Sequence, residues 1–190
     1  MACIKSLSDR DFPANTGPEN RIPAAMRIAL FQPDIPQNTG TILRLCACLG
    51  VEAHIIEPAG FPVSDRHFRR AGMDYLDRVR ITRHDTWPQF ERWRQAGGHR
   101  LILLTTRGDR CYLDHQFDNG DVLLLGRESA GVPDEVAAKA DARLVIPIRP
   151  GMRSLNVAMA AAIVAGEALR QTGQFGKAAR PDPCAVAAAT

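Results

Sequence analysis

Residues 146–158 read Ile146-Pro147-Ile148-Arg149-Pro150-Gly151-Met152-Arg153-Ser154-Leu155-Asn156-Val157-Ala158. The stretch predicts a strand that runs through a turn containing proline and glycine and then directly into a helix of small residues. A junction of this kind presents backbone amide groups to a ligand. The stretch therefore indicates an α/β fold with a binding site at the end of a strand.

Two further segments, residues 34–44 and 123–133, have a similar arrangement. Each follows a short apolar run and carries a glycine where the chain must turn tightly or let another group approach. In α/β sheets, ligands bind beyond the carboxyl ends of the strands. We therefore expect these segments and residues 146–158 to build one composite site.

Short apolar strands alternate with helical patterns from Met26 onward. The expected strands are residues 27–31, 53–56, 78–82, 101–104, 121–125 and 142–146. The expected helices are residues 41–49, 65–71 and 86–95, a helix beginning near Pro133, and residues 155–171. Near-continuous apolar strands between helices indicate an α/β fold, in which a mostly parallel sheet is covered by helices on both faces.

One domain accounts for most of the 190 residues. Residues 26–175 are expected to form it, with Met26 as a candidate start. Residues 1–25 are polar and aperiodic, and we expect them and residues 176–190 to be disordered. No apolar run approaches the roughly 18 to 20 residues that cross a bilayer, and the N-terminus lacks a signal peptide. These features predict a cytoplasmic protein with no membrane contact.

The composition excludes several kinds of site. The five cysteines form no C-x-x-C pair and no Cys/His cluster with zinc spacing, so we expect reduced thiols and no metal. Neither G-x-G-x-x-G nor a P-loop follows any strand, and no G-x-S-x-G is present. What remains is a pocket rich in backbone groups, which suits an adenine ring. Asn38, Thr39 and Ser154 have an alternative role as helix caps.

Basic residues cluster in one window although the net charge is only +3. The window contains Arg66, His67, Arg69, Arg70, Arg78, Arg80, Arg83 and His84. Because the planar guanidinium suits phosphate, the cluster predicts an anionic partner such as a nucleic acid. A solvated basic face, or a GC-rich genome that favours arginine, is the alternative.

The three segments resemble the three motifs of the SPOUT RNA ribose 2′-O-methyltransferases in order and spacing. The matching residues are Asn38-Thr39-Gly40 with Arg44, then Gly126-x-Glu128-x-x-Gly131-x-Pro133, then Ile146-Pro147-Ile148 with Arg153-Ser154-Leu155-Asn156-Val157-Ala158. The resemblance covers residues 26–175. It is strongest to the short members that act on the tRNA wobble nucleotide, which similarly carry His54-Ile55-Ile56-Glu57-Pro58 and Arg69-Arg70-Ala71-Gly72-x-Asp74-Tyr75.

The resemblance implies a fold that the pattern alone does not predict. Unknotted connections are the default for a sheet of this kind. Members of the family instead thread the C-terminal segment through a loop in a deep trefoil knot, which binds S-adenosylmethionine. By the same resemblance the cofactor contacts Leu104, Gly126, Ile146 and Ser154. The family also implies a homodimer with its active site at the subunit interface.

The implied reaction transfers a methyl group from S-adenosylmethionine to the ribose 2′-hydroxyl of the wobble nucleotide, cytidine or a modified uridine, in leucine tRNAs. Arg44, reaching the site from the neighbouring subunit, is the first catalytic candidate, with an interface ion pair as its alternative role. The other catalytic candidates are Asn38, Glu128 and Asn156. The residues expected to bind the anticodon stem-loop are Arg66, Arg69, Arg70, Arg83, Arg107 and Arg153.

Two alternatives stay open from the sequence. One is the same chemistry on another tRNA nucleotide or on ribosomal RNA. The dipeptide Gly166-Glu167 leaves this alternative open, because many wobble-specific relatives carry an aromatic residue before this glutamate. The other is a non-catalytic RNA-binding factor. No general base is identified, since His54 and His67 match no catalytic position.

Overall fold

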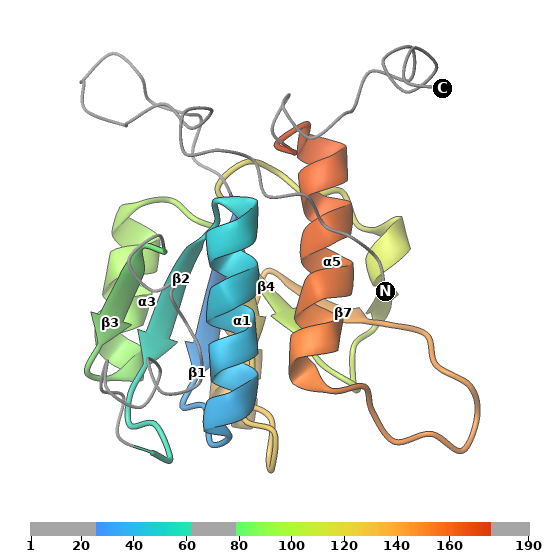
Figure 1. Ribbon diagram of the computed structural model, residues 1–190, viewed down its shortest axis with the longest axis horizontal. Coiled ribbons are helices and arrows are strands. Elements are labelled where there is room, and N and C mark those ends of the chain that lie inside the picture. The colour runs from blue at the N-terminus through green and yellow to red at the C-terminus, as the bar shows by residue number, and fades with distance from the viewer. Residues whose placement is uncertain (1–25, 62–78, 176–190) are drawn as a thin grey trace, which may run out of the picture.

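The computed structural model describes residues 26–61 and 79–175. Its strands form one sheet in the order β3-β2-β1-β6-β4-β7-β5, and all neighbouring pairs are parallel (Figure 1). The strands are β1 (Arg27–Phe31), β2 (Glu52–Ile56), β3 (Ile81–His84), β4 (Leu101–Leu104), β5 (Arg110–Cys111), β6 (Val122–Leu125) and β7 (Ala142–Val145). The predicted parallel α/β sheet is confirmed.

Helices cover both faces of this sheet, as predicted. They are α1 (Pro36–Leu49), α3 (Trp87–Ala96), α4 (Asp134–Ala137) and α5 (Val157–Thr172), with a short 3-10 turn, η2 (Tyr112–Asp114). Helices α1 and α5 stand side by side on one face, while α3 lies behind the sheet in Figure 1. Within the described parts of the chain, no helix has the length and apolar content that a membrane crossing requires.

The strands are apolar on both sides because each face has its own core. In β1, Ile28 and Leu30 pack with α1 and α5, whereas Ala29 and Phe31 pack with α3 and α4. Successive side chains of a strand point to opposite faces, so a run without polar residues fills both cores. Each fully buried leucine or isoleucine contributes about 1.5–3 kcal/mol. This double burial holds the strand ends, and therefore the loops that follow them, in place.

Helix α1 begins five residues earlier than expected. Pro36 occupies its first turn, where a missing N–H costs nothing, and Ile35 precedes it without a side-chain cap. Asn38 and Thr39 therefore lie inside the first turn, and their alternative role as caps is wrong. This position leaves the Asn38 amide available for contacts between loops.

The start of α5 also differs from the prediction. Asn156 caps it by accepting the Ala158 N–H at 2.9 Å and the Met159 N–H at 3.4 Å. The alternative role of Ser154 as the cap is therefore wrong. Strand β3 is shifted from residues 78–82 to Ile81–His84, and the two-residue β5 was not predicted because so short a segment has no periodicity. The helix expected at residues 65–71 lies outside the described residues.

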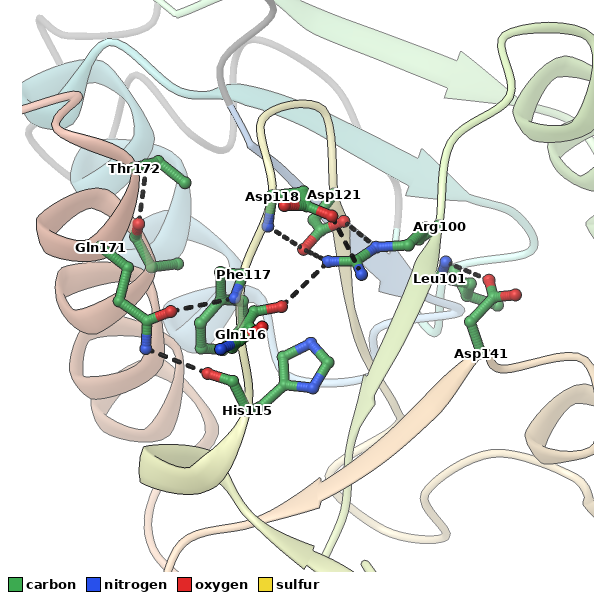
Figure 2. Close-up of polar contacts among 11 residues, drawn as sticks. Arg100, Leu101, His115, Gln116, Phe117, Asp118, Asp121, Asp141, Gln171 and Thr172 are labelled. Atoms are coloured by element: carbon green, nitrogen blue, oxygen red, sulfur yellow. Dashed lines mark hydrogen bonds and ion pairs between the residues drawn. The ribbon is translucent and has the colours of Figure 1, made fainter.

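The segment before β6 is fastened to its surroundings by two sets of polar contacts (Figure 2). Gln171 of α5 accepts the Phe117 N–H and donates to the His115 carbonyl, both at 3.0 Å. On the other side, Arg100 forms a two-pronged ion pair with the buried Asp121, at 2.8 Å for each contact. The segment is thus held between the last helix and the start of β4.

Candidate functional site

A pocket of about 310 Å³ opens at the carboxyl ends of β4, β6 and β7. Its lining comes from three stretches of chain: residues 103–106, 125–132 and 145–160. The four residues predicted to contact the cofactor all line it: Leu104, Gly126, Ile146 and Ser154. The structure therefore brings together residues from three separate strand ends.

The wall from residue 126 to residue 131 is a closed turn. Arg127 and Gly131 exchange two backbone hydrogen bonds of 2.9 and 2.8 Å. Gly131 has φ +69°, which favours glycine, and a Cβ added to Gly126 would lie 2.6 Å from the Gly131 carbonyl carbon. The two glycines of the second motif are therefore required by the shape of this turn.

A relay of side chains joins the first segment to the other two. The Asn38 amide donates to Glu128 Oε1 at 3.1 Å, and the Asn156 amide donates to Asn38 Oδ1 at 2.9 Å. The other side-chain atom of Asn156, its Oδ1, caps α5. Glu128 also lines the pocket, whereas Asn38 and Asn156 are not among its lining residues. Three of the predicted catalytic residues thus form one connected network beside the pocket.

Arg44, the fourth catalytic candidate, lies on α1 six residues after Asn38. It is exposed on α1 and is not among the described residues that line the pocket. Its contribution to the site of another subunit stays a prediction.

The predicted RNA-binding arginines divide into two groups. Arg83, Arg107 and Arg153 are exposed, and Arg153 lines the pocket. Arg107 approaches Asp134 at 3.6 Å, and both side chains are mostly exposed, so this pair contributes little to stability. The other three candidates, Arg66, Arg69 and Arg70, lie outside the described residues.

His54 is a buried core residue and does not line the pocket. Its Nδ1 lies 2.9 Å from Nε2 of His84, and both rings are buried between β2, β3 and α3. His67 lies outside the described residues. Over residues 26–61 and 79–175, no group of three His, Cys, Asp or Glu side chains is arranged to bind a metal ion.

Sequence reasoning missed part of the pocket wall. Arg127 and Leu155 lie inside the second and third motifs and line the pocket, but nothing in the residue types marked them. No role was predicted for Asp34 beyond its place as the first residue of the first segment. Its carboxylate contacts the backbone of Glu128.

Comparison with known proteins gives concordant matches. Residues 25–166 match the profile of the SpoU rRNA Methylase family. A protein of Beijerinckia indica named tRNA (cytidine(34)-2′-O)-methyltransferase is 67% identical over 79% of this chain and 94% of its own length. An Escherichia coli protein of the same name is 40% identical over 82% of this chain and 99% of its own.

Solved structures agree with these sequence matches. One, described as giving structural insights into the 2-OH methylation of C/U34 on tRNA, is 40% identical with a TM-score of 0.72. It covers 78% of this chain and 97% of its own. An AdoMet-bound rRNA methyltransferase from Sinorhizobium meliloti is 31% identical with a TM-score of 0.69, over 77% of this chain and 56% of its own.

Proposed function

The chain belongs to the SpoU rRNA methylase family, and from this membership we propose that it is a tRNA (cytidine(34)-2′-O)-methyltransferase. It transfers a methyl group from S-adenosylmethionine to the ribose 2′-hydroxyl of the wobble nucleotide, cytidine or a modified uridine, of leucine tRNAs. The observation that carries the proposal is the meeting of all four predicted cofactor contacts in one pocket. The relatives of this name match along almost their whole length, which supports the same substrate.

The pocket suits S-adenosylmethionine in size and chemistry. Its volume of about 310 Å³ is within the range of small-molecule sites. Leucine and isoleucine side chains supply apolar walls for the adenine ring, and the backbone of the closed turn supplies hydrogen-bonding groups. Leu104, Gly126, Ile146 and Ser154 would hold the cofactor.

Positioning is the main contribution of the protein to the reaction. When bound, S-adenosylmethionine supplies an activated methyl group. Alignment of a bound ribose with that group is worth roughly 7 to 11 kcal/mol for well-oriented reactants. The Asn38, Glu128 and Asn156 network holds the three loops in register. The guanidinium of Arg44 stabilises the negative charge that develops on the 2′-oxygen.

The proposed enzyme is a homodimer, with Arg44 of one copy completing the pocket of the other. Support comes from α5, where Met159 and Ile163 are 52% and 40% exposed. The two residues are one helical turn apart, and Ile35 and Leu155 near the loops are also exposed. Apolar side chains grouped in this way favour a subunit interface over open solvent.

The proposed C-terminal knot has support from the sheet order. Strand β7 lies between β4 and β5, although β4 and β5 are joined by only residues 105–109. That connection is hydrogen-bonded to β7 at both ends, from Thr105 N–H to the Leu144 carbonyl and from Asp109 N–H to the Arg143 carbonyl. A late strand enclosed by an early connection is the arrangement that a threaded chain requires.

Exposed arginines are the proposed contacts for the anticodon stem-loop. Arg83, Arg107 and Arg153 would join Arg66, Arg69 and Arg70 in binding phosphates, which position the RNA without reading its sequence. Recognition of the loop would then come from its unpaired bases. With tRNA as the substrate, we infer that the protein acts in the cytoplasm. We also propose that residues 26–175 form its catalytic domain.

One experiment tests the proposal and its competitors. Purified protein is incubated with total tRNA or ribosomal RNA and methyl-labelled S-adenosylmethionine, and the labelled nucleoside is mapped after digestion. We expect 2′-O-methylcytidine or 2′-O-methyluridine at position 34 of leucine tRNAs. Label at another nucleotide, or in ribosomal RNA, would replace the assigned substrate. Absence of both label and cofactor binding would leave a non-catalytic RNA-binding protein.

A further inference from the structure

Asp34 lies where the first segment meets the second, just after β1 and outside the pocket lining. Its carboxylate accepts two successive backbone groups, the Glu128 N–H at 3.1 Å and the Ser129 N–H at 3.3 Å. The Ser129 hydroxyl donates to the same carboxylate. Successive amides that converge on one anion are a favourable arrangement for negative charge. Asp34 therefore occupies the tip of the turn formed by residues 127–131.

The contact is reciprocal. The backbone N–H of Asp34 donates to Glu128 Oε2 at 3.3 Å, so each residue binds the main chain of the other through its side chain. Among the described residues, no other acceptor contacts the backbone N–H groups of Glu128 and Ser129. Loss of the Asp34 carboxylate would leave the tip of the turn without a protein partner.

The backbone next to Asp34 is hydrogen-bonded to the loop that follows β2. The preceding carbonyl, of Pro33, accepts the Gly60 N–H at 2.8 Å, so the loop after β2 supports it. The turn that Asp34 holds contributes Arg127, Glu128 and Gly131 to the pocket wall. Movement of the turn would therefore change the pocket directly.

The charges of the two carboxyl groups are unequal. A hydrogen bond from the Glu128 side chain is the main reason that the pKa of Asp34 is lowered to about 2. Burial, followed by the hydrogen bond to Asp34, raises the pKa of Glu128. The surroundings therefore favour the charged form more strongly at Asp34 than at Glu128, whose Oε1 accepts from the Asn38 amide.

We propose that Asp34 is a positioning residue for the methyl donor, holding the turn of residues 127–131 and the Glu128 side chain in the shape that the cofactor binds. The inference rests on the proposed function, because the ligand of this pocket is S-adenosylmethionine in both. It adds a residue that does not line the pocket and that acts through its contacts with Glu128 and Ser129.

The test compares the wild-type protein with Asp34→Asn. The amide side chain is nearly the same size, but its NH₂ group faces N–H donors where an oxygen is needed. The Kd for S-adenosylmethionine, measured by calorimetry, should rise about tenfold or more. Hydrogen exchange of the Glu128 and Ser129 amides should accelerate in the protein without cofactor, while amides of the central strands stay protected.

The pH dependence separates this role from a general loss of stability. In the wild type, cofactor affinity should weaken as the pH rises through the raised pKa of Glu128, because a second negative charge then forms beside Asp34. In Asp34→Asn that weakening should disappear, because Glu128 then ionises beside a neutral amide. A purely structural defect would lower affinity at every pH and leave the weakening at high pH in place.

Two further variants keep the result interpretable. Asp134→Asn removes an exposed aspartate that pairs with Arg107 at 3.6 Å, and the Kd of this variant should stay within about twofold of the wild type. Ser129→Ala removes one of the three groups that bind Asp34, and a smaller rise of about two- to threefold is expected. It substitutes for Asp34→Asn if that variant does not fold.

The outcomes distinguish the two proposals. Wild-type affinity in Asp34→Asn, with unchanged exchange at Glu128 and Ser129, would overturn the role of Asp34 and leave the enzyme assignment intact. If the wild type bound no S-adenosylmethionine, the proposed function would fail. The exchange measurement on the protein alone would then still decide whether Asp34 holds the turn.

Discussion

Gly126 shows how a single residue shapes the candidate site. Its backbone lies against Gly131, and there is no room between them for one methyl group. Both glycines line the pocket, so their close approach shapes its wall. The second motif therefore needs glycine at both positions, for different reasons. At residue 126 a side chain would collide with the backbone of Gly131, and at residue 131 the backbone has a positive φ.

Gly126→Ala should damage both the fold and the pocket. The added Cβ would lie 2.6 Å from the Gly131 carbonyl carbon and 2.8 Å from its Cα, and backbone atoms cannot move aside cheaply. We expect the free energy of unfolding to fall by about 1–3 kcal/mol. The Kd for S-adenosylmethionine should rise at least about tenfold in calorimetry.

Gly166→Ala is the matched control. It lies inside α5, and an added Cβ would meet nothing within 4 Å. Alanine is the better helix former, so the free energy of unfolding should rise by about 0.5–1 kcal/mol with unchanged cofactor affinity. Equal losses in the two variants would show that the contact with Gly131 is not the cause.

At the scale of elements, α5 is bound to its neighbours by polar contacts as well as by its apolar face. Gln171 bridges two backbone groups of the segment that precedes β6, as Figure 2 shows. The helix thereby connects the motif loop at its N-terminus to the segment before β6, whose Phe117 packs in the same core as α5. Side-chain hydrogen bonds therefore hold both ends of α5, from Asn156 at its start and from Gln171 at its end.

Gln171→Ala should loosen that second anchor. The variant loses two hydrogen bonds of 3.0 Å, which leaves the Phe117 N–H and the His115 carbonyl without this partner, and a third of 2.8 Å to Glu167. The free energy of unfolding, from urea denaturation, should fall by about 1–3 kcal/mol. Gln116→Ala, at an exposed position of the same segment, should change it by less than about 0.5 kcal/mol. Similar values for both variants would contradict the bridging role.

The packing of β2, β3 and α3 predicts sensitivity to acid. Burial lowers the pKa of His54 to about 3 and also lowers that of His84, although Glu52 and Asp85 nearby favour the charged form of His84. Both pKa values lie below the ordinary 6.5, so at acidic pH the unfolded chain binds protons that the folded protein excludes. The stabilisation is complete above about pH 6.5 and decreases as the pH falls below it.

Denaturation at pH 7, 6 and 5 measures this effect. The unfolding free energy should drop by up to about 1.4 kcal/mol per pH unit for each excluded proton. His84→Gln keeps a polar partner for His54 but cannot be protonated, and it should reduce the slope. A stability that is constant between pH 7 and pH 5 would contradict the burial of neutral rings.

At the scale of the whole molecule, Arg44 is exposed on α1 and is not one of the described residues that line the pocket. One copy therefore presents a cofactor pocket and a separate arginine, with exposed Met159 and Ile163 on α5. A two-fold dimer would bring the arginine of each copy to the pocket of the other. The proposed catalytic site would then require both copies.

Mixing two inactive variants tests that arrangement. Arg44→Ala should bind S-adenosylmethionine without transferring the methyl group, and Gly126→Val should lose cofactor binding. Co-expressed mixed dimers contain one intact site if Arg44 acts across the interface, so a random mixture should regain about a quarter of wild-type activity. If Arg44 acts within its own chain, no site is intact and the mixture stays inactive.

Most of the fold was predictable because the strands are short, apolar and separated by clear breaks. Strands β1, β2, β4 and β6 lie where the sequence placed them, within a residue at each end. The misses have local causes. The start of α1 was set by a proline that suits the first turn, and α5 is capped by Asn156 instead of Ser154. Strand β5 is too short for any pattern to reveal.

By itself the sequence determined the alternation of strands and helices and the three loops that meet at one end of the sheet. It did so because apolar periodicity and glycine placement are local properties of the chain. Only the tertiary structure decided that Asn38, Glu128 and Asn156 share one network and that Asp34 binds the tip of the second loop. Hydrogen bonds between residues 90 or more positions apart depend on how the strands are ordered in the sheet, and no local pattern specifies that order.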